Sequence, residues 1–329
     1  MLQAEADVQE EIVSPHLYKL SESSLFSFRS IRVAVLGSVV YLLISYLLIG
    51  FKTDQLFLVF LFNSLYFASA TTRRFILGFS VFILYWIVFD YMKAFPNFRY
   101  SPVHIASLYN LEKSFFGFNW NDQWVTPNEF FAQNHTTFLD ILSGFFYLCW
   151  IPVPLLFAGI MFFKNRTYFF QFALTFFLVN LIGFAGYYMY PAAPPWYVAQ
   201  KGFEFVAATP GNTAGLARFD ALFGVRIFAG IYSKSSNVFA AMPSLHAAYM
   251  MIVVFYSIKA RWKRLYTFLF AFIMLGIWFT AVYSSHHYIL DILAGIACAV
   301  LGIALIQYFF QRSTAGKHLV QKLVTLTSR

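Results

Sequence analysis

Three ionisable side chains, in two short clusters, have the types and the spacing of a catalytic group. The first cluster has the sequence PSLH and ends at His246, and the second has the sequence HHYILD and contains His287 and Asp291. His287 and Asp291 are four positions apart, so on a helix they share a face and the carboxylate can reach the imidazole. A histidine oriented by an acid, with a second histidine beside it, has the outline of a nucleophile, an orienting group and a general acid.

Phosphoryl transfer is the chemistry that uses this outline best. A phosphoester needs an in-line nucleophile, a proton for the leaving alkoxide and cations for the equatorial oxygens. We predict that His287 attacks, that Asp291 fixes its tautomer, and that His246 protonates the departing oxygen. Arginine or lysine must then hold the phosphate oxygens. Arg218 and Lys234 are the candidates, because their segment leads directly into the His246 cluster.

A metal site is the alternative interpretation of the same residues, since two histidines and a carboxylate can form an open iron site. Membrane di-iron enzymes need many more histidines, and two of the seven here, His16 and His318, lie in the tails. We therefore predict no metal and no other cofactor. His286 would lie about 100° from His287 on a helix, so we assign it, together with Ser244, to contact with the substrate phosphate.

The composition identifies the elements that must position these residues as membrane helices. The chain has 329 residues, of which 60% are hydrophobic and 11% charged. A soluble domain of this length cannot hide so much apolar surface, whereas a bilayer accepts it. We predict an all-α, polytopic membrane helical bundle of about eight transmembrane helices, since a span needs about 20 apolar residues. The apolar runs are 33–51, 56–70, 75–91, 138–163, 168–190, 239–257, 265–284 and 287–310.

The net charge is +9. The distribution of the basic residues reflects the topology of such a bundle and does not indicate binding to nucleic acid. Most of the 23 lysines and arginines lie in the two tails and in the loops on the same side. By the positive-inside rule both termini face the cytoplasm. Both histidine clusters then open helices at the outer face, where they can meet; on opposite faces they would be ~30 Å apart. The active site is predicted on the periplasmic or lumenal side, in a bacterial inner membrane or a Golgi membrane.

Composition divides the chain into a lead-in, a group of helices, a catalytic domain and a tail. These parts are a cytoplasmic lead-in at 1–30, three N-terminal transmembrane helices at 31–91, a membrane catalytic domain at 92–311 and a basic cytoplasmic tail at 312–329. The catalytic domain contains two long outer segments, 92–137 and 191–238. Aromatic residues suit the headgroup layer, so we predict that Tyr190, Trp196 and Tyr197 lie there and line the substrate pocket.

Three motifs, in order, resemble the type-2 phosphatidic acid phosphatase superfamily, and within it the inositol phosphorylceramide synthase branch that includes the aureobasidin-resistance proteins. The motifs are YPAAPPWY at 190–197, FAAMPSLHAA at 239–248 and HHYILD at 286–291. The similarity extends more loosely over about residues 100–305. The resemblance implies that His246, His287 and Asp291 are the catalytic triad of this family, carried by its membrane core.

Two departures from the superfamily pattern favour one branch of it. Its phosphatases hold phosphate with arginines in an Arg-Pro pair and in a Ser-Arg pair, but this chain has no Arg-Pro and has Thr280 and Ala281 in place of Ser-Arg. The headgroup transferases, sphingomyelin synthases among them, resemble this chain in keeping the triad without those arginines. The resemblance therefore implies transfer of inositol phosphate from phosphatidylinositol to a ceramide-like lipid alcohol, through a phosphohistidine.

Two other functions remain open from the residues alone. A lipid phosphate phosphatase would use the same triad with water as the acceptor, because the dryness and shape of the pocket select the acceptor. A transporter or flippase would perform no chemistry and would carry broken helices at mid-bilayer, whereas the motifs here lie at helix ends. The expected partners are a phospholipid donor and a lipid alcohol acceptor, and the sequence identifies no protein partner.

Overall fold

A computed structural model describes residues 25–207, 209–234 and 237–328. These residues form two compact units, one that runs up to Ser80 and resumes at Gln321, and one that spans Val81–Val320. Most of the predicted lead-in, 1–30, lies outside the described residues. The division into compact units falls inside the third helix and near the C-terminus, so the composition-based boundaries at 91 and 311 stay predictions.

Hydrogen bonds and ring contacts join the helices of the first unit. Asn63 donates a hydrogen bond to the Ser38 hydroxyl at 2.9 Å. Arg73 donates to the Tyr66 carbonyl at 2.9 Å and lies over the Tyr66 ring. The first unit contains α1 (Phe28–Ile49), α2 (Thr53–Ala68) and the start of α3 (Ala70–Tyr91), and the end of α15 (Thr314–Ser328) belongs to it.

Six helical stretches among the described residues are long and apolar enough to cross a membrane, by length and composition. They are Phe28–Ile49, Ala70–Ala94, Thr137–Lys164, Arg166–Met189 (α8), Arg264–Tyr283 (α13) and Ile289–Arg312 (α14). A shorter apolar helix, α12 (Leu245–Lys259), and the 16-residue α2 correspond to the other two predicted spans. The predicted all-α, polytopic membrane bundle is therefore confirmed, with eight as an approximate number of spans.

One predicted helix is two helices in the structure. The apolar run at 138–163 folds as α6 (Thr137–Leu148) and α7 (Pro152–Lys164). Pro152 explains the break, because proline lacks an N–H group and disfavours the helical conformation in the residue before it. The break places Trp150 against His246, with ring centroids 4.3 Å apart.

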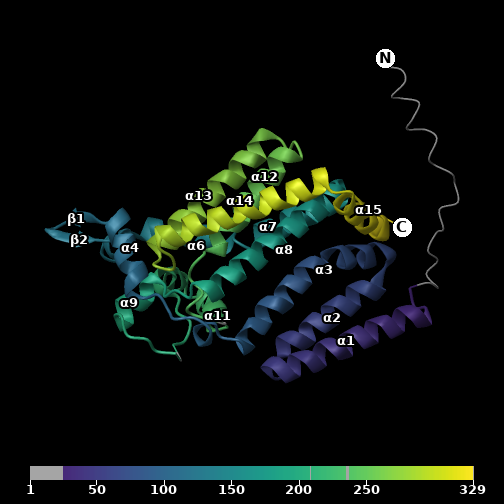
Figure 1. Ribbon diagram of the computed structural model, residues 1–329, viewed down its shortest axis with the longest axis horizontal. Helices are drawn as coiled ribbons and strands as arrows, with labels where there is room; N and C mark the ends of the chain where they lie inside the picture. Colours follow the sequence, from purple (N-terminus) through teal and green to yellow (C-terminus); the bar gives the residue numbers. More distant parts are fainter. Residues whose placement is uncertain (1–24, 208, 235–236, 329) are drawn as a thin grey trace, which may run out of the picture. The chain divides into compact units, whose positions relative to one another are not determined.

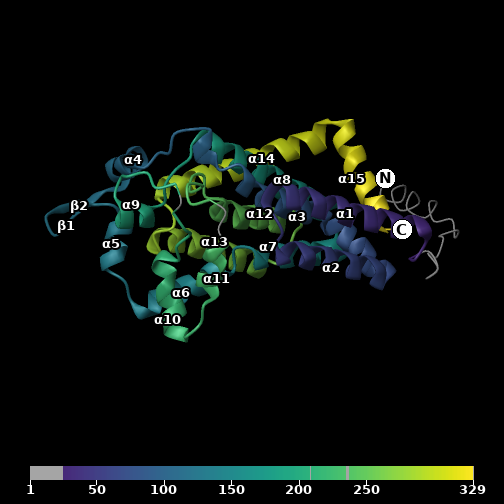
Figure 2. The same cartoon turned by 90° about the horizontal axis from the view of Figure 1, so that it is seen from below.

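Helices α8, α12, α13 and α14 pack together in the second unit (Figures 1 and 2). Glycines permit close approach to the segment that begins α12. A Cβ atom at Gly183 of α8 would lie 2.5 Å from the Leu245 side chain, and one at Gly295 of α14 would lie 2.0 Å from the Ser244 carbonyl oxygen. This packing fixes the start of α12 against α14.

The two outer segments gather around the ends of these helices where α12 and α14 begin (Figures 1 and 2). Their elements are short: 3₁₀ turns at Met92–Ala94, Asn97–Arg99 and Ala214–Leu216, α4 (Ala106–Phe116), β1 (Phe118–Trp120), β2 (Gln123–Val125), α5 (Pro127–Gln133), α9 (Pro195–Lys201), α10 (Ala217–Phe223) and α11 (Ile227–Ser233). β1 and β2 form an antiparallel hairpin in which Asn119 pairs with Trp124. Backbone bridges also join His104, Ala192 and Ala240 in parallel.

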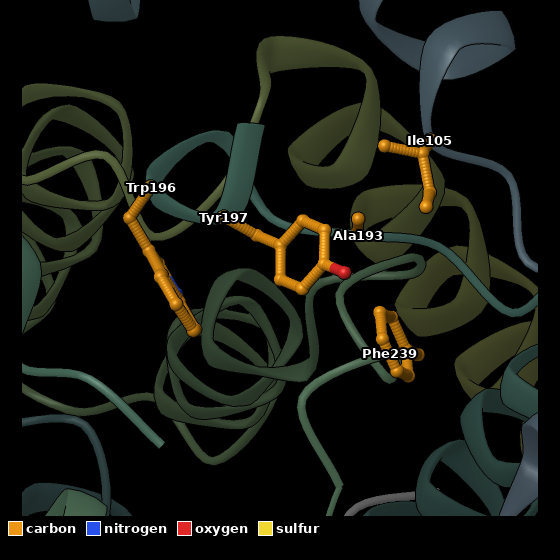
Figure 3. Packing of buried hydrophobic residues seen from close by; sticks show 5 residues of the cluster. All are labelled: Ile105, Ala193, Trp196, Tyr197 and Phe239. Atoms are coloured by element: carbon orange, nitrogen blue, oxygen red, sulfur yellow. The ribbon is translucent and has the colours of Figure 1, made fainter. Parts of the chain in front are cut away.

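Two of the three aromatic residues predicted to lie in the headgroup layer are packed inside this outer cover. Trp196 is 6% exposed and Tyr197 is fully buried. The two rings form a cluster with Ile105, Ala193 and Phe239, which come from three separate segments (Figure 3). The sequence does not show that the outer segments fold over one another and give these rings an apolar interior, and their predicted place in the headgroup layer stays a prediction. Their predicted role in the substrate pocket stays a prediction.

Tyr190 differs from its two aromatic neighbours because it stays partly exposed. Its ring stacks on His104 with centroids 3.7 Å apart and an interplanar angle of 4°. The His104 imidazole also hydrogen-bonds the Ser107 hydroxyl at 3.0 Å. Tyr190 therefore packs the C-terminal end of α8 against the first outer segment. Its predicted contact with substrate stays a prediction.

Candidate active site

The structure brings His246, His287 and Asp291 together, although they come from two helix ends. His246 Nδ1 and His287 Nε2 are 3.1 Å apart and share a hydrogen bond. The other nitrogen of His287, Nδ1, lies 3.5 Å from Asp291 Oδ2. That distance is longer than a strong hydrogen bond, and catalytic hydrogen bonds often tighten only when substrate is bound. The carboxylate is fully buried and the His287 side chain nearly so.

A sharp turn after α13 presents the two adjacent histidines. Ser285 adopts a φ of 60°, in the left-handed region. The backbone N–H groups of His286 and His287 then both donate to the Ala281 carbonyl at 3.0 Å. The turn therefore uses the Ala281 carbonyl near the end of α13 twice and places His287 directly beside that helix end.

The pairing of His287 with Asp291 comes from a helix cap rather than from a shared helical face. The sequence predicted a helix from 287, but α14 begins at Ile289, and His287 precedes it. Asp291 lies in the first turn, where its Oδ2 accepts the Tyr288 N–H at 2.8 Å. Acidic residues near a helix start pair with unsatisfied N–H groups in this way, and the same oxygen faces the imidazole of His287.

One backbone hydrogen bond sets the position of His246 relative to this pair. The Ser244 N–H donates to the Asp291 carbonyl at 2.8 Å, so the start of α12 is tied to the first turn of α14. Ser244 itself is fully buried, and its Oγ has no hydrogen-bond partner among the residues that the structure describes. Its predicted contact with the substrate phosphate stays a prediction.

Aromatic rings enclose His246. Trp150 meets it edge to face, and the Tyr147 ring centroid lies 5.1 Å from that of the imidazole. Trp150 also stacks on Tyr249. This apolar wall limits access of water to the histidine pair and strengthens the electrostatic interactions inside the site.

His286 contacts the second outer segment. Its Nε2 hydrogen-bonds the Thr213 carbonyl at 3.0 Å, and its ring stacks on Tyr232 with an interplanar angle of 7°. Burial, with a smaller contribution from neighbouring His287, lowers the pKa of His286 to about 3, so the ring is neutral near pH 7. These contacts support a structural role, and the predicted contact of His286 with the phosphate stays a prediction.

Arg218 brings a guanidinium group to the edge of the same turn. Its Nε donates to Asp140 Oδ1 at 2.6 Å, and its Cζ lies 5.2 Å from the centre of the Tyr283 ring. A Cβ atom at Gly215 would lie 3.0 Å from Arg218 Nη2 and 2.8 Å from the Ser284 Cα. Arg218 Nη2 is buried and has no hydrogen-bond partner within the described part of the chain. A buried charged donor without an acceptor is suited to bind an anion.

Lys234, the other predicted phosphate ligand, has an exposed side chain at the end of α11. Its role stays a prediction. Sequence reasoning missed Asp140, which orients Arg218 and also accepts the Tyr283 hydroxyl at 2.8 Å. The available signal was an aspartate inside an apolar run, because a carboxylate there needs a partner.

Potential metal ligands do not cluster at this site or elsewhere in the described ranges. Among residues 25–207, 209–234 and 237–328, no group of three or more His, Cys, Asp and Glu side chains could hold a metal ion. The groups that face the His287 ring are the His246 imidazole and the Asp291 carboxylate, which suit a proton relay.

Comparison with known proteins matches the PAP2 superfamily to residues 106–305. A phosphoinositol dihydroceramide synthase of Bacteroides thetaiotaomicron is 49% identical over 271 residues, which are 82% of this chain and 88% of the relative. The catalytic subunits of inositol phosphorylceramide synthase from Schizosaccharomyces pombe and Saccharomyces cerevisiae are 30% and 32% identical over 68% and 69% of this chain. The matched regions are 51% and 54% of those fungal proteins. No solved structure matches the chain.

Proposed function

The chain belongs to the PAP2 superfamily, and from this premise we propose that it moves inositol phosphate from phosphatidylinositol to a ceramide-like lipid alcohol. The observation that carries the proposal is its 49% identity, over most of both chains, to a phosphoinositol dihydroceramide synthase. The resemblance predicted from the three motifs is confirmed by these matches. A lipid phosphate phosphatase is the second candidate, because the same triad could pass the phosphate to water.

The geometry around His287 supports its Nε2 as the nucleophile. With the proton on Nδ1, facing Asp291, the Nε2 lone pair is free to accept a hydrogen bond from His246 Nδ1 or to attack phosphorus. In the first step Nε2 forms an N–P bond, the bond from phosphorus to the diacylglycerol oxygen breaks, and His246, which starts as the imidazolium, gives that oxygen a proton and becomes neutral. The donor phosphate must enter between the two rings, which now contact each other.

The second step reverses the proton transfer with a new alcohol. His246 takes a proton from the acceptor hydroxyl, the resulting oxygen attacks phosphorus, and the N–P bond to His287 breaks. The aromatic wall of Tyr147, Trp150 and Tyr249 supports a lipid alcohol over water as the acceptor, because it limits hydrolysis of the intermediate.

The proposed location of the site follows from charge and membrane topology. Lysine and arginine gather in the tails and in the loops on their side, which supports cytoplasmic termini. With His246 and His287 at the opposite ends of their helices from those loops, we place the active site on the periplasmic or lumenal side. A cysteine-accessibility experiment on intact vesicles would test this orientation.

We expect cleavage of phosphatidylinositol to require a lipid acceptor. Purified protein in micelles with radiolabelled phosphatidylinositol should release diacylglycerol rapidly only when ceramide is added, and the label should be recovered on ceramide. The reason is that the enclosed phosphohistidine is protected from water. Rapid release of inositol phosphate or inorganic phosphate, with no dependence on ceramide, would instead establish the phosphatase.

Replacing Arg218 with alanine should weaken both half-reactions to the same degree, because the guanidinium group would hold the same phosphate in each. The loss of one charge-assisted hydrogen bond predicts kcat/KM lower by roughly 10- to 100-fold. Arg226→Ala is the matched control, since Arg226 is an exposed arginine of the same outer segment. Normal rates for Arg218→Ala, or an effect equal to that of the control, would remove Arg218 from the phosphate site.

A further inference from the structure

The outer helix α4 contains a carboxylate that is fully buried. Glu112 is 0% exposed, and its two oxygens accept the backbone N–H groups of Ile289 at 2.9 Å and Leu290 at 3.1 Å. These are the first N–H groups of α14, which have no partner within their own helix. A negative charge is also favourable at a helix N-terminus. Glu112 therefore caps the helix that carries Asp291, from a segment far away in the sequence.

A buried amide acts on the other side of the same turn. Asn128 of α5 is 3% exposed, and its Nδ2 donates to the His287 carbonyl at 3.0 Å and to the Val282 carbonyl at 2.9 Å. Asn128 thus connects the end of α13 to the backbone of His287. The turn is therefore held on both sides: Asn128 binds its carbonyl groups, and Glu112 binds the N–H groups that follow it.

Glu112 and Asn128 thus contact only backbone atoms in and beside the turn that carries the His287 imidazole. We propose that Glu112 and Asn128 are positioning residues, which hold the backbone at 287–290 so that the imidazole of His287 meets both Asp291 and the donor phosphate. The inference rests on the proposed function of this site. Catalytic groups must be held within about 0.5 Å of the productive geometry, and a misplacement of about 1 Å can cost roughly 100-fold in rate.

The charge of Glu112 gives this inference a distinctive pH dependence. Burial raises the pKa of Glu112 to about 6, against the two backbone N–H groups that lower it, and the charge of Asp291 raises it further. Below that pH the carboxyl group is protonated and keeps only one good acceptor oxygen. The other ionisable groups around it are Tyr288 at the start of α14, Tyr109 and Lys113 on α4, and Glu129 on α5.

The test compares Glu112→Gln with Glu129→Gln in the full-length protein. A glutamine at 112 can accept only one of the two N–H groups, and its NH₂ group faces the other. We expect kcat for diacylglycerol release to fall roughly 10- to 100-fold near pH 8 with KM for phosphatidylinositol little changed, since Glu112 contacts only backbone. The gap should close as the pH falls through about 6, because the wild-type carboxyl group is then protonated as well.

Glu129→Gln is the matched control because it makes the same change in the same outer segment. Glu129 accepts the Thr126 N–H and the Tyr109 hydroxyl, each at 2.7 Å, so a glutamine there also keeps only one good acceptor oxygen, but neither bond reaches the turn at 287–290. Its kcat should equal that of the wild-type protein at every pH. A Glu112→Gln rate equal to wild type, or a rate lowered by the same factor at every pH, would overturn the positioning role.

A second readout does not depend on turnover. Hydrogen exchange of a peptide that covers 284–291 should be faster in Glu112→Gln and in Asn128→Ala, with exchange in α8 unchanged; unchanged exchange in that peptide would also overturn the inference. If Glu112→Gln does not accumulate in the membrane, Asn128→Ala decides alone. Diacylglycerol release is measured whether ceramide or water is the acceptor, so the test remains valid if the protein is a phosphatase. A wild-type protein that cleaves no donor would contradict only the proposed function.

Discussion

Replacing His287 with alanine should abolish cleavage of the donor lipid, with turnover lower by at least about 10³-fold, because removal of a nucleophile eliminates the covalent route. The protein should still insert into the membrane. His287 is only 5% exposed, so alanine also leaves a small cavity. His287→Gln is the second variant, since it fills more of the space and lacks the imidazole.

The measurement for His287 is the trapping of labelled headgroup phosphate on the protein. Wild-type protein mixed with radiolabelled phosphatidylinositol and quenched in base should retain the label, and both variants should retain none. His318→Ala, which changes an exposed histidine of α15, is the control and should behave as wild type. Normal turnover in either His287 variant would end the phosphohistidine mechanism.

The second large effect is expected at a residue that contacts no substrate. An alanine at Gly295 would place its Cβ 2.0 Å from the Ser244 carbonyl oxygen, which is closer than atoms approach without movement. The start of α12 must shift, and with it His246. Overpacking of this kind costs about 1–3 kcal/mol, so we expect a lower melting temperature and turnover reduced by at least about tenfold, the scale of that free energy.

Gly159→Ala is the control for Gly295→Ala, because a Cβ atom at Gly159 would have nothing within 4 Å. It lies within α7, where alanine is the better helix former by about 1 kcal/mol. Its melting temperature and turnover should match or exceed those of wild type. Wild-type turnover in Gly295→Ala would show that the packing of α12 on α14 does not position His246.

The sequence predicts the members of the candidate triad because their signal is local. Histidine and aspartate at the ends of apolar runs are informative, since charge in a membrane protein needs a reason. Charge distribution then placed the two clusters at one face, and the structure brings their side chains together. The lengths of the apolar runs predicted most of the spans, but not that α14 begins two residues later than predicted, nor the break before Pro152.

The anchors of the site could not be predicted, because each depends on contacts between distant parts of the chain. Glu112 is a single acidic residue on a short helix whose other polar residues are exposed or half-buried, and only its approach to Ile289 shows what it does. The same holds for Trp196, which a membrane sequence presents as an interfacial ring and the fold places inside a cluster. Residue type and spacing indicate chemistry, whereas the supporting contacts require the fold.

The cap on α14 has a consequence for how the protein is made. Glu112 and Ile289 are 177 positions apart, and Asn128 and His287 are 159 apart. Synthesis proceeds from the N-terminus at roughly 5–20 residues per second, so α4 and α5 leave the ribosome well before the turn that they hold. The carboxylate of Glu112 must therefore stay solvated, or bind a temporary partner, until α14 has inserted. The active site is therefore completed only when the final span is in place, and a nascent chain that stops before α14 lacks Asp291.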